Sequence, residues 1–190
     1  MNRMCVFCGS SRGGHPSYQE ATRELARVLV QQRMDLIYGG GGIGLMGILA
    51  DTVLSLGGKV YGVITDALMA REVAHRHLTE LAVVSTMHER KAKMSSMADG
   101  FIALPGGFGT FEELLEVITW AQLGLHSRPI GLLNVRNYFS PLLDLIDHSV
   151  REGFIQASHR QIVVASQEPG ELVRFLNNYV PVADLDRWID

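Results

Sequence analysis

The sequence predicts one α/β domain over residues 1–190, a doubly wound, Rossmann-like fold with a mostly parallel sheet of about seven strands. Three observations predict it. Short apolar runs rich in Val, Ile and Leu alternate with longer amphipathic runs, which is typical of strands buried on both faces and of the helices that cover them. Several apolar runs end in glycine-rich turns. No linker, repeat or low-complexity segment divides the chain.

Each short apolar run is expected to form one strand, because continuous Val, Ile and Leu content suits a parallel sheet. The expected strands are Arg3–Cys8, Leu36–Tyr38, Lys59–Ile64, Leu81–Val84, Phe101–Leu104, Pro129–Leu133 and Gln161–Val164. The amphipathic runs between them predict helices, the first with a proline near its start, where proline is favoured. The expected helices are Pro16 to about Arg33, Leu45–Leu56, His88–Ala98, Thr110–Leu123, Phe139–Arg151 and Glu168–Asn178. The stretch from Ile64 to about Glu80 has no clear periodicity and is left unassigned.

Composition excludes several classes of protein. The net charge of −3 and the pI near 6.2 argue against a broad nucleic-acid surface. No apolar stretch reaches the ~20 residues that a membrane span needs. The opening residues run straight into a strand without a leader pattern, so a cytoplasmic protein is expected, with neither nucleic acid nor membrane as a partner.

Cys5 and Cys8 form a lone C-x-x-C motif within the first strand. Side chains alternate faces along a strand, so the odd spacing places the two thiols on opposite sides. They are therefore expected to be buried structural thiols. The histidines show no metal-ligand spacing, and His75 and His77 are interpreted as a solvated loop pair, so no metal is expected.

Ligands bind parallel α/β sheets beyond the carboxyl ends of the strands, near the point where strand order reverses. The loops expected there are Gly9–Gly14, Gly39–Gly44, Ser85–Arg90 and Pro105–Thr110. The last is the most informative, because a strand runs into three glycines and then a helix. Glycines let backbone N–H groups converge on an anion, and the helix N-terminus adds partial positive charge. The same turn delivers Glu112 and Glu113, which suggests chemistry on a phosphorylated substrate.

Glu113 also has a purely structural interpretation. Thr110 and Glu113 fit a capping box, in which Thr110 begins the helix and Glu113 reaches back to its amide. Helical geometry places Phe111, Leu114 and Leu115 on one apolar face and Glu113 almost opposite. The carboxylate is then free to face the mouth of a site, as a cap or as a catalyst.

Two further motifs flank the predicted site. Gly42-Ile-Gly-Leu-Met-Gly47 matches the dinucleotide fingerprint G-x-G-x-x-G, with Asp66 as its acidic partner. Because it follows the second strand, tight strand–helix packing with a phosphate or ribose contact is favoured over NAD(P) binding. Arg90 and Lys91 fall in the first turn of the helix His88–Ala98, where cations oppose the helix dipole. Because these cations also lie beside a predicted site, a functional role for them is as well supported as a simple position on a solvated helix face.

Pro105–Glu113, Met87–Lys91 and Tyr38–Gly47 together closely resemble the motifs of the LOG ("lonely guy") family. These are cytokinin riboside 5′-monophosphate phosphoribohydrolases, once labelled lysine decarboxylases. The resemblance extends from the Cys5 strand to about residue 165. It implies hydrolysis of the N-glycosidic bond of an adenine-type, including N6-modified, nucleoside 5′-monophosphate, giving the free base and ribose 5-phosphate. It also implies a homodimer and no cofactor.

The resemblance further implies that Arg90 and Glu113 are the catalytic pair and that the Gly107–Thr110 loop holds the 5′-phosphate. The implied substrate contacts are Glu72, Arg90, Lys91, Gly106, Gly107, Phe108, Gly109, Thr110, Phe111, Glu112, Glu113 and Thr119, with Ser10, Gly41, Gly42 and Met87 as additional contacts. A carboxylate can stabilise oxocarbenium character at C1′. Arg90 would either neutralise charge on the departing base or orient Glu113.

Three other functions compete with this one. A carrier for a phosphorylated cofactor of the molybdenum cofactor type would keep the glycine-rich loop, but it would not need both Arg90 and Glu113. A nicotinamide-dependent oxidoreductase would use Gly42–Gly47. A lysine decarboxylase is least favoured, because 190 residues leave little room for a pyridoxal phosphate site.

Overall fold

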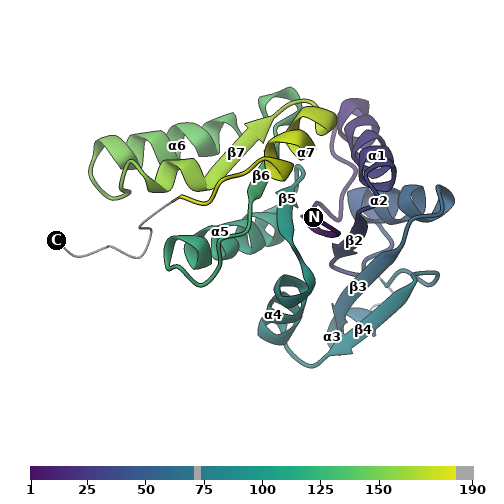
Figure 1. Ribbon diagram of the computed structural model, residues 1–190. Coiled ribbons are helices and arrows are strands. Elements are labelled where there is room, and N and C mark those ends of the chain that lie inside the picture. Colours follow the sequence, from purple (N-terminus) through teal and green to yellow (C-terminus); the bar gives the residue numbers. More distant parts are fainter. Residues whose placement is uncertain (71–73, 183–190) are drawn as a thin grey trace.

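The computed structural model describes residues 1–70 and 74–182, which form one seven-stranded sheet between two layers of helices (Figure 1). The strands are β1 (Arg3–Phe7), β2 (Asp35–Tyr38), β3 (Val60–Thr65), β4 (Glu80–Val84), β5 (Gly100–Ala103), β6 (Ile130–Leu133) and β7 (Val163–Ser166). Their order is β4-β3-β2-β1-β5-β6-β7, and every neighbouring pair is parallel. The predicted doubly wound α/β fold is confirmed.

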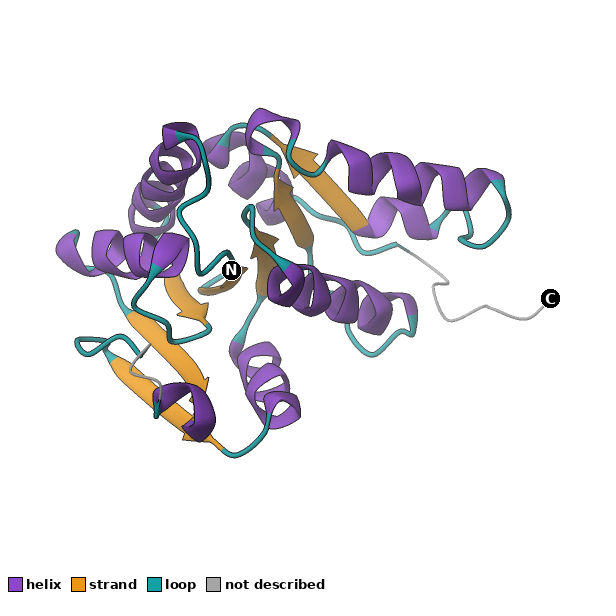
Figure 2. Ribbon diagram, turned by 180° about the vertical axis from the view of Figure 1, so that it is seen from behind, coloured by secondary structure: helices purple, strands orange, loops and turns teal. Residues whose placement is uncertain are grey.

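The helices divide between the two faces of the sheet. They are α1 (Pro16–Gln31), α2 (Gly44–Ser55), α3 (Asp66–Met69), α4 (Met87–Met97), α5 (Phe108–Gln122), α6 (Ser140–Arg151) and α7 (Pro169–Asn177), with 3₁₀ turns η1 (Val135–Asn137) and η2 (His159–Ile162). Buried side chains of α1, α2 and α7 pack in one core cluster, whereas those of α4 and α5, with partly buried leucines of α6, pack in the other. Figure 2 shows the strands running between these two groups. In residues 1–70 and 74–182, no helix is long and apolar enough to cross a membrane.

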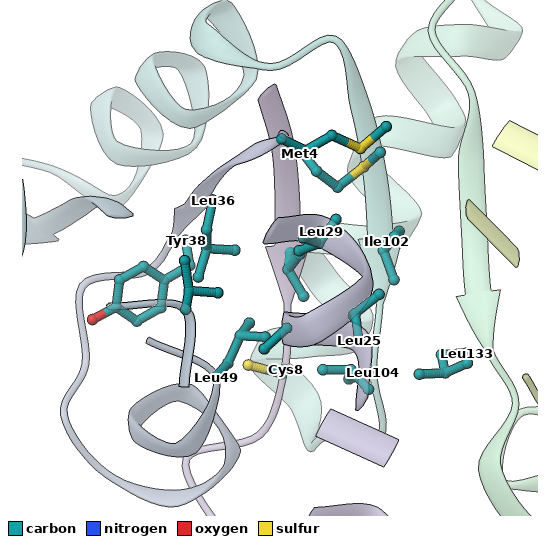
Figure 3. Close-up of a cluster of buried hydrophobic side chains, with 14 of the residues drawn as sticks. Met4, Cys8, Leu25, Leu29, Leu36, Tyr38, Leu49, Ile102, Leu104 and Leu133 are labelled. Atoms are coloured by element: carbon teal, nitrogen blue, oxygen red, sulfur yellow. The ribbon is translucent and has the colours of Figure 1, made fainter. Parts of the chain in front are cut away.

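The central strand β1 contributes to both cores. Met4 and Cys8 join the cluster shown in Figure 3, where they lie among Leu25, Leu29 and other apolar side chains. Cys5 belongs to the opposite cluster. Both cysteines are buried free thiols on opposite faces of the sheet, as the odd spacing predicts.

Two segments differ from the expectation. The unassigned stretch after β3 contains the short helix α3, which begins where the Thr65 hydroxyl accepts a hydrogen bond from the Leu68 amide (3.4 Å). The last strand begins at Val163, two residues later than predicted, because His159–Ile162 form a 3₁₀ turn. Ile162 is 1 % exposed, so its apolar character reflects burial in the core outside the sheet.

Strand order reverses between β1 and β5, because the chain runs outward from β1 through β2, β3 and β4 and then returns to β5 on the other side. The loops after β1 and β5 therefore leave the sheet side by side. The Gly9 amide donates to the Pro105 carbonyl (3.1 Å), which joins the two loops directly. The predicted ligand site lies at this junction.

Candidate active site

A cavity of about 440 Å³ opens at the carboxyl edge of the sheet, above the β1–β5 junction. This volume lies in the range of small-molecule sites. Its lining comes from all four predicted loops and from six residues outside them, of which Cys8, Met46, Ile64 and Leu68 are apolar and Glu112 and Glu113 are acidic. The loop residues are Gly9, Ser10, Gly39, Gly41, Ile43, Met87, Arg90, Gly107, Phe108, Gly109 and Thr110. The described part of the chain holds no cluster of three or more His, Cys, Asp or Glu residues able to bind a metal ion.

Two glycines permit the close packing of these loops. Gly44 has a φ of +63°, and a Cβ there would lie 2.2 Å from the Ser10 carbonyl carbon. A Cβ on Gly106 would lie 2.0 Å from the Thr110 hydroxyl. Both contacts are far shorter than van der Waals distance, so a larger residue at position 44 would push α2 away from the β1 loop, and one at position 106 would displace the Thr110 side chain. Close packing between α2 and the β1 loop thus accounts for Gly44 in the G-x-G-x-x-G motif.

Arg90 extends from α4 into the wall of the cavity and is held at three points. Its Nε donates to the Val63 carbonyl (3.0 Å), its Nη1 to Glu113 Oε1 (2.9 Å) and its Nη2 to the Gly39 carbonyl (3.4 Å). A Cβ on Gly39 would lie 2.0 Å from Nη2, so the glycine makes room for the guanidinium. These contacts fix the plane of the guanidinium and leave other N–H groups for a ligand.

Glu113 is the buried partner of Arg90. It is 8 % exposed, and its Oε2 has no hydrogen-bond partner within residues 1–70 and 74–182. Burial raises the pKa of its carboxyl, while the Arg90 charge and hydrogen bond oppose that rise. A buried carboxylate with a shifted pKa and a free oxygen on a cavity is typical of a catalytic group.

The capping-box prediction is wrong. Helix α5 begins at Phe108, two residues before Thr110, and its N-cap Gly107 provides no side-chain cap. Thr110 and Glu113 therefore lie inside the helix. They share its buried face with Leu114 and Val117, whereas Leu115 is 45 % exposed. The sequence therefore predicted the wrong buried face for this helix. The positions of Phe and Leu residues alone do not reveal that Arg90 lies nearby and makes burial of the Glu113 carboxylate favourable.

Lys91 lies beside Arg90 on α4 but faces away from the cavity lining. Its Nζ donates to Glu112 Oε1 and to Glu116 Oε1, the second at 2.9 Å. Burial lowers the pKa of the Lys91 ammonium, and its hydrogen bonds and charge interactions with the two carboxylates raise it. Together the carboxylates have the larger effect, so the pKa is raised overall. Lys91 is thus a charged bridge between α4 and α5.

The structure brings most of the other predicted residues to the cavity. Ser10, Gly41, Met87, Gly107, Phe108, Gly109, Thr110 and Glu112 all line it. Four do not. The Gly106 carbonyl accepts from the Tyr138 hydroxyl, and Phe111 stacks on the Tyr138 ring with centroids 6.3 Å apart. Gly42 packs against His75, and the Thr119 hydroxyl donates to the Leu115 carbonyl (2.7 Å). Glu72 lies outside the described residues. The roles predicted for all of these residues stay predictions.

Sequence reasoning missed an apolar wall of the cavity. Ile64 ends β3, Leu68 lies on α3, and Met46 lies on α2. Each resembles an ordinary core residue in its local pattern. Only the folded arrangement of three separate elements places them together beside Arg90.

Comparison with known proteins extends these observations. The family model described as "Possible lysine decarboxylase" matches residues 46–176, more than half of the chain. The chain is 54 % identical over 182 residues to cytokinin riboside 5′-monophosphate phosphoribohydrolase LOG7 of Arabidopsis thaliana, covering 96 % of this chain and 84 % of that protein. It is likewise 54 % identical over 179 residues to the enzyme LOG of Oryza sativa subsp. japonica, covering 94 % and 74 %.

Similar solved structures are more distant in sequence. The molybdenum cofactor binding protein of Rippkaea orientalis has a TM-score of 0.69 at 16 % identity, covering 93 % of this chain and 96 % of that one. The molybdenum cofactor carrier protein of Chlamydomonas reinhardtii gives 0.69 at 14 % identity, with the same coverage. Likeness at such identities concerns the fold alone.

Proposed function

The chain belongs to the LOG family of cytokinin riboside 5′-monophosphate phosphoribohydrolases, which hydrolyse N-glycosyl bonds, and we propose that it cleaves adenine-type nucleoside 5′-monophosphates with Arg90 and Glu113 as the catalytic pair. The observation that carries this proposal is the buried ion pair between the two side chains, which closes at 2.9 Å on the wall of the cavity. Burying a carboxylate costs solvation free energy, and a catalytic role for Glu113 accounts for that cost.

The start of α5 supports a phosphate site on the same cavity. Gly107 caps the helix without a side-chain hydrogen bond, so the first-turn amides of Phe108, Gly109 and Thr110 lack helical acceptors. Such amides and the helix dipole favour a phosphate. An anchored 5′-phosphate would fix the ribose over Glu113, which contributes binding energy remote from the bond that breaks.

Glu113 is suited to stabilise the reacting sugar. As the C1′–N bond breaks, positive charge develops at C1′, and a carboxylate about 3 Å away would stabilise it electrostatically. The free Oε2 can also accept a proton from the attacking water, while Arg90 holds Oε1 in place. Orientation of Glu113 is the role of Arg90 that its three fixed hydrogen bonds support.

The base would then lie against the apolar wall of Met46, Ile64 and Leu68, which Ile43 and Met87 extend toward the mouth of the cavity. Ile43 and Met87 are 47 % and 44 % exposed, so the wall is open toward solvent. An open apolar wall accommodates a flat adenine ring and leaves space for an apolar N6 substituent. We therefore propose that both plain and N6-alkylated adenine nucleotides enter the site.

Base release from phosphorylated and unphosphorylated substrates tests this function. We expect adenine to be released from AMP, and the modified base from N6-isopentenyladenosine 5′-monophosphate. The matching nucleosides should react at least about 10²-fold more slowly in kcat/KM, because they lose the charge-assisted hydrogen bonds at the α5 N-terminus. Chromatography of the free base after incubation gives both rates. Equal rates with and without the 5′-phosphate would contradict the proposed phosphate site. If none of the two nucleotides and two nucleosides released its base, the hydrolase function would be overturned and a binding function would remain.

We also propose that the chain forms a homodimer through α5 and α6. Helix α6 has no buried residue, although it carries Leu142, Leu143 and Leu145. Leu125 and Phe154, which follow α5 and α6, are 68 % and 86 % exposed. Apolar side chains gathered in this way are typical of interfaces. The cytoplasmic location stays a prediction.

Light scattering during gel filtration tests the dimer. We expect twice the chain mass of 21.0 kDa for the natural protein. Phe154→Asp should give monomer, because a charge in an apolar interface is costly. Leu56→Asp, at the end of α2, is the matched control on another exposed leucine and should remain dimeric. Monomer for the natural protein at micromolar concentration would contradict the proposal.

A further inference from the structure

Tyr138 lies beside the turn that begins α5 but does not line the substrate cavity. It follows β6, which pairs with β5, so the loops after these two strands leave the sheet next to each other. The Tyr138 hydroxyl donates to the Gly106 carbonyl. This hydrogen bond links the loop after β6 to the glycine-rich turn that we propose as the phosphate site.

Three aromatic rings hold the Tyr138 ring in place. Phe111 of α5 stacks on it with an interplanar angle of 15°. Tyr18 of α1 and Phe139 meet it edge-on, with ring centroids 6.1 and 5.1 Å away. Stacked and edge-to-face pairs are favourable arrangements of aromatic rings. Because its neighbours already restrict the ring, its hydroxyl reaches the turn at little further cost in side-chain entropy.

The backbone that carries Tyr138 adopts an unfavourable conformation that nearby hydrogen bonds maintain. Arg136 and Asn137 have φ angles of +54° and +61°, in the left-handed region that costs free energy for residues other than glycine. Asn134 closes this turn, because its Oδ1 accepts from the Phe139 amide (2.7 Å) and its carbonyl accepts from the Asn137 amide (3.0 Å). The turn fixes where Tyr138 meets the loop after β5.

The Gly106–Gly107 peptide unit converts the Tyr138 hydrogen bond into a fixed direction for the Gly107 amide. The unit is planar and trans, so its C=O and N–H groups point in opposite directions. With the carbonyl held by Tyr138, the N–H points away from the tyrosine. Gly107 lines the cavity, and its N–H has no acceptor within residues 1–70 and 74–182. A phosphate at the start of α5 would meet this amide together with those of the first turn.

We propose that Tyr138 is a positioning residue for the substrate phosphate: its hydroxyl holds the Gly106 carbonyl and thereby keeps the Gly107 N–H directed at the 5′-phosphate. This inference rests on the proposed function, because it places Tyr138 behind the phosphate site of the same reaction. An amide that is oriented before the ligand arrives lowers the ordering cost of binding. Since amide hydrogen bonds to phosphate are charge-assisted, losing this orientation should weaken phosphorylated ligands selectively.

Tyr138→Phe tests the proposal, because it removes the hydroxyl and keeps the ring against Phe111. Titration calorimetry with ribose 5-phosphate measures the phosphate site without turnover. We expect its Kd to rise about three- to tenfold, the effect of one hydrogen bond. The kcat/KM for AMP should fall by a similar factor, whereas that for adenosine should stay unchanged, since adenosine has no phosphate to orient. A general folding defect would instead lower both.

Tyr18→Phe is the matched control, because it removes the hydroxyl of the tyrosine that meets Tyr138 edge-on. It should change neither the Kd for ribose 5-phosphate nor the ratio of the AMP and adenosine rates.

The outcomes separate this inference from the proposed function. An unchanged Kd in Tyr138→Phe, even with a lower thermal stability, would overturn the role of Tyr138 and leave the hydrolase function intact. If the natural protein bound ribose 5-phosphate but released no base from AMP, the hydrolase function would be overturned, and weaker binding by Tyr138→Phe would still support the positioning role. If the natural protein failed to bind ribose 5-phosphate, the phosphate site and the role of Tyr138 would both be overturned.

Discussion

Replacing Glu113 with glutamine is expected to reduce base release by between about 10² and 10⁴-fold while the protein stays folded. Glutamine has almost the same shape, and its carbonyl oxygen can still accept the hydrogen bond that Arg90 Nη1 gives to Oε1 in the natural protein. What it loses is the negative charge beside C1′ and the ability to take a proton from water. The measurement is kcat for AMP, with circular dichroism and thermal unfolding as checks on the fold.

Glu116→Gln is the matched control for this variant. Glu116 lies on the same helix, one turn from Glu112, and does not line the substrate cavity. It should retain most of the activity, because it touches Lys91 and not the substrate. If Glu113→Gln remained as active as the natural protein, Glu113 would be a structural residue, and another group would have to stabilise the reacting sugar.

The pH dependence of kcat in the natural enzyme is expected to reflect the titration of Glu113. Burial raises the pKa of Glu113 above its ordinary value, against the opposing effect of Arg90. Since the reaction needs the ionised form, kcat is expected to fall on the acid side with an apparent pKa above that of a solvated glutamate. The residual activity of Glu113→Gln should lack this acid limb. An acid limb unchanged in that variant would assign the titration to a different group.

The second large effect is expected from Arg90→Met, which should destabilise the fold by about 3–5 kcal/mol and reduce activity by at least about 10²-fold. Methionine fills much of the volume but leaves Glu113 buried without its cation. It also releases the carbonyl groups of Val63 and Gly39 from their donor. Urea unfolding and kcat for AMP measure the two losses.

The loss of stability in Arg90→Met should increase as the pH rises. Burial raises the folded-state pKa of Glu113, so its favourable contribution is present below its unfolded-state pKa and is lost as pH rises through the folded-state pKa. Without Arg90 the folded-state pKa rises further, since its strongest lowering influence is gone. Arg90→Met should therefore be less destabilised at pH 5 than at pH 8.

Two comparisons make this prediction specific. The double variant Arg90→Met with Glu113→Gln should be more stable than Arg90→Met alone at pH 8, because no unpaired charge stays buried. Arg27→Met removes an exposed partner of Glu24 and should cost no more than about 1 kcal/mol. A destabilisation of Arg90→Met that is equal at both pH values would mean that Glu113 titration is not its cause.

The sequence predicts the fold well because its signals are local. Continuous apolar runs identify all seven strands, with the last displaced by two residues. The odd spacing of Cys5 and Cys8 places them correctly on opposite faces, since strand periodicity depends on the backbone alone. Glycine runs mark the loops that meet at the switch point. The short helix α3 was missed, because four residues are too few to show a period.

By itself, then, the sequence predicted the doubly wound α/β fold, the four loops that line the cavity and, through resemblance, the pairing of Arg90 with Glu113. Only the tertiary structure decided which face of α5 is buried and which carboxylate each cation binds. Glu112 and Glu113 are adjacent in sequence, about 100° apart around the helix, and equivalent in local pattern. The packing of α4 against α5 gives Glu113 to Arg90 and Glu112 to Lys91. That choice depends on contacts between residues more than 20 positions apart, and no local periodicity encodes it.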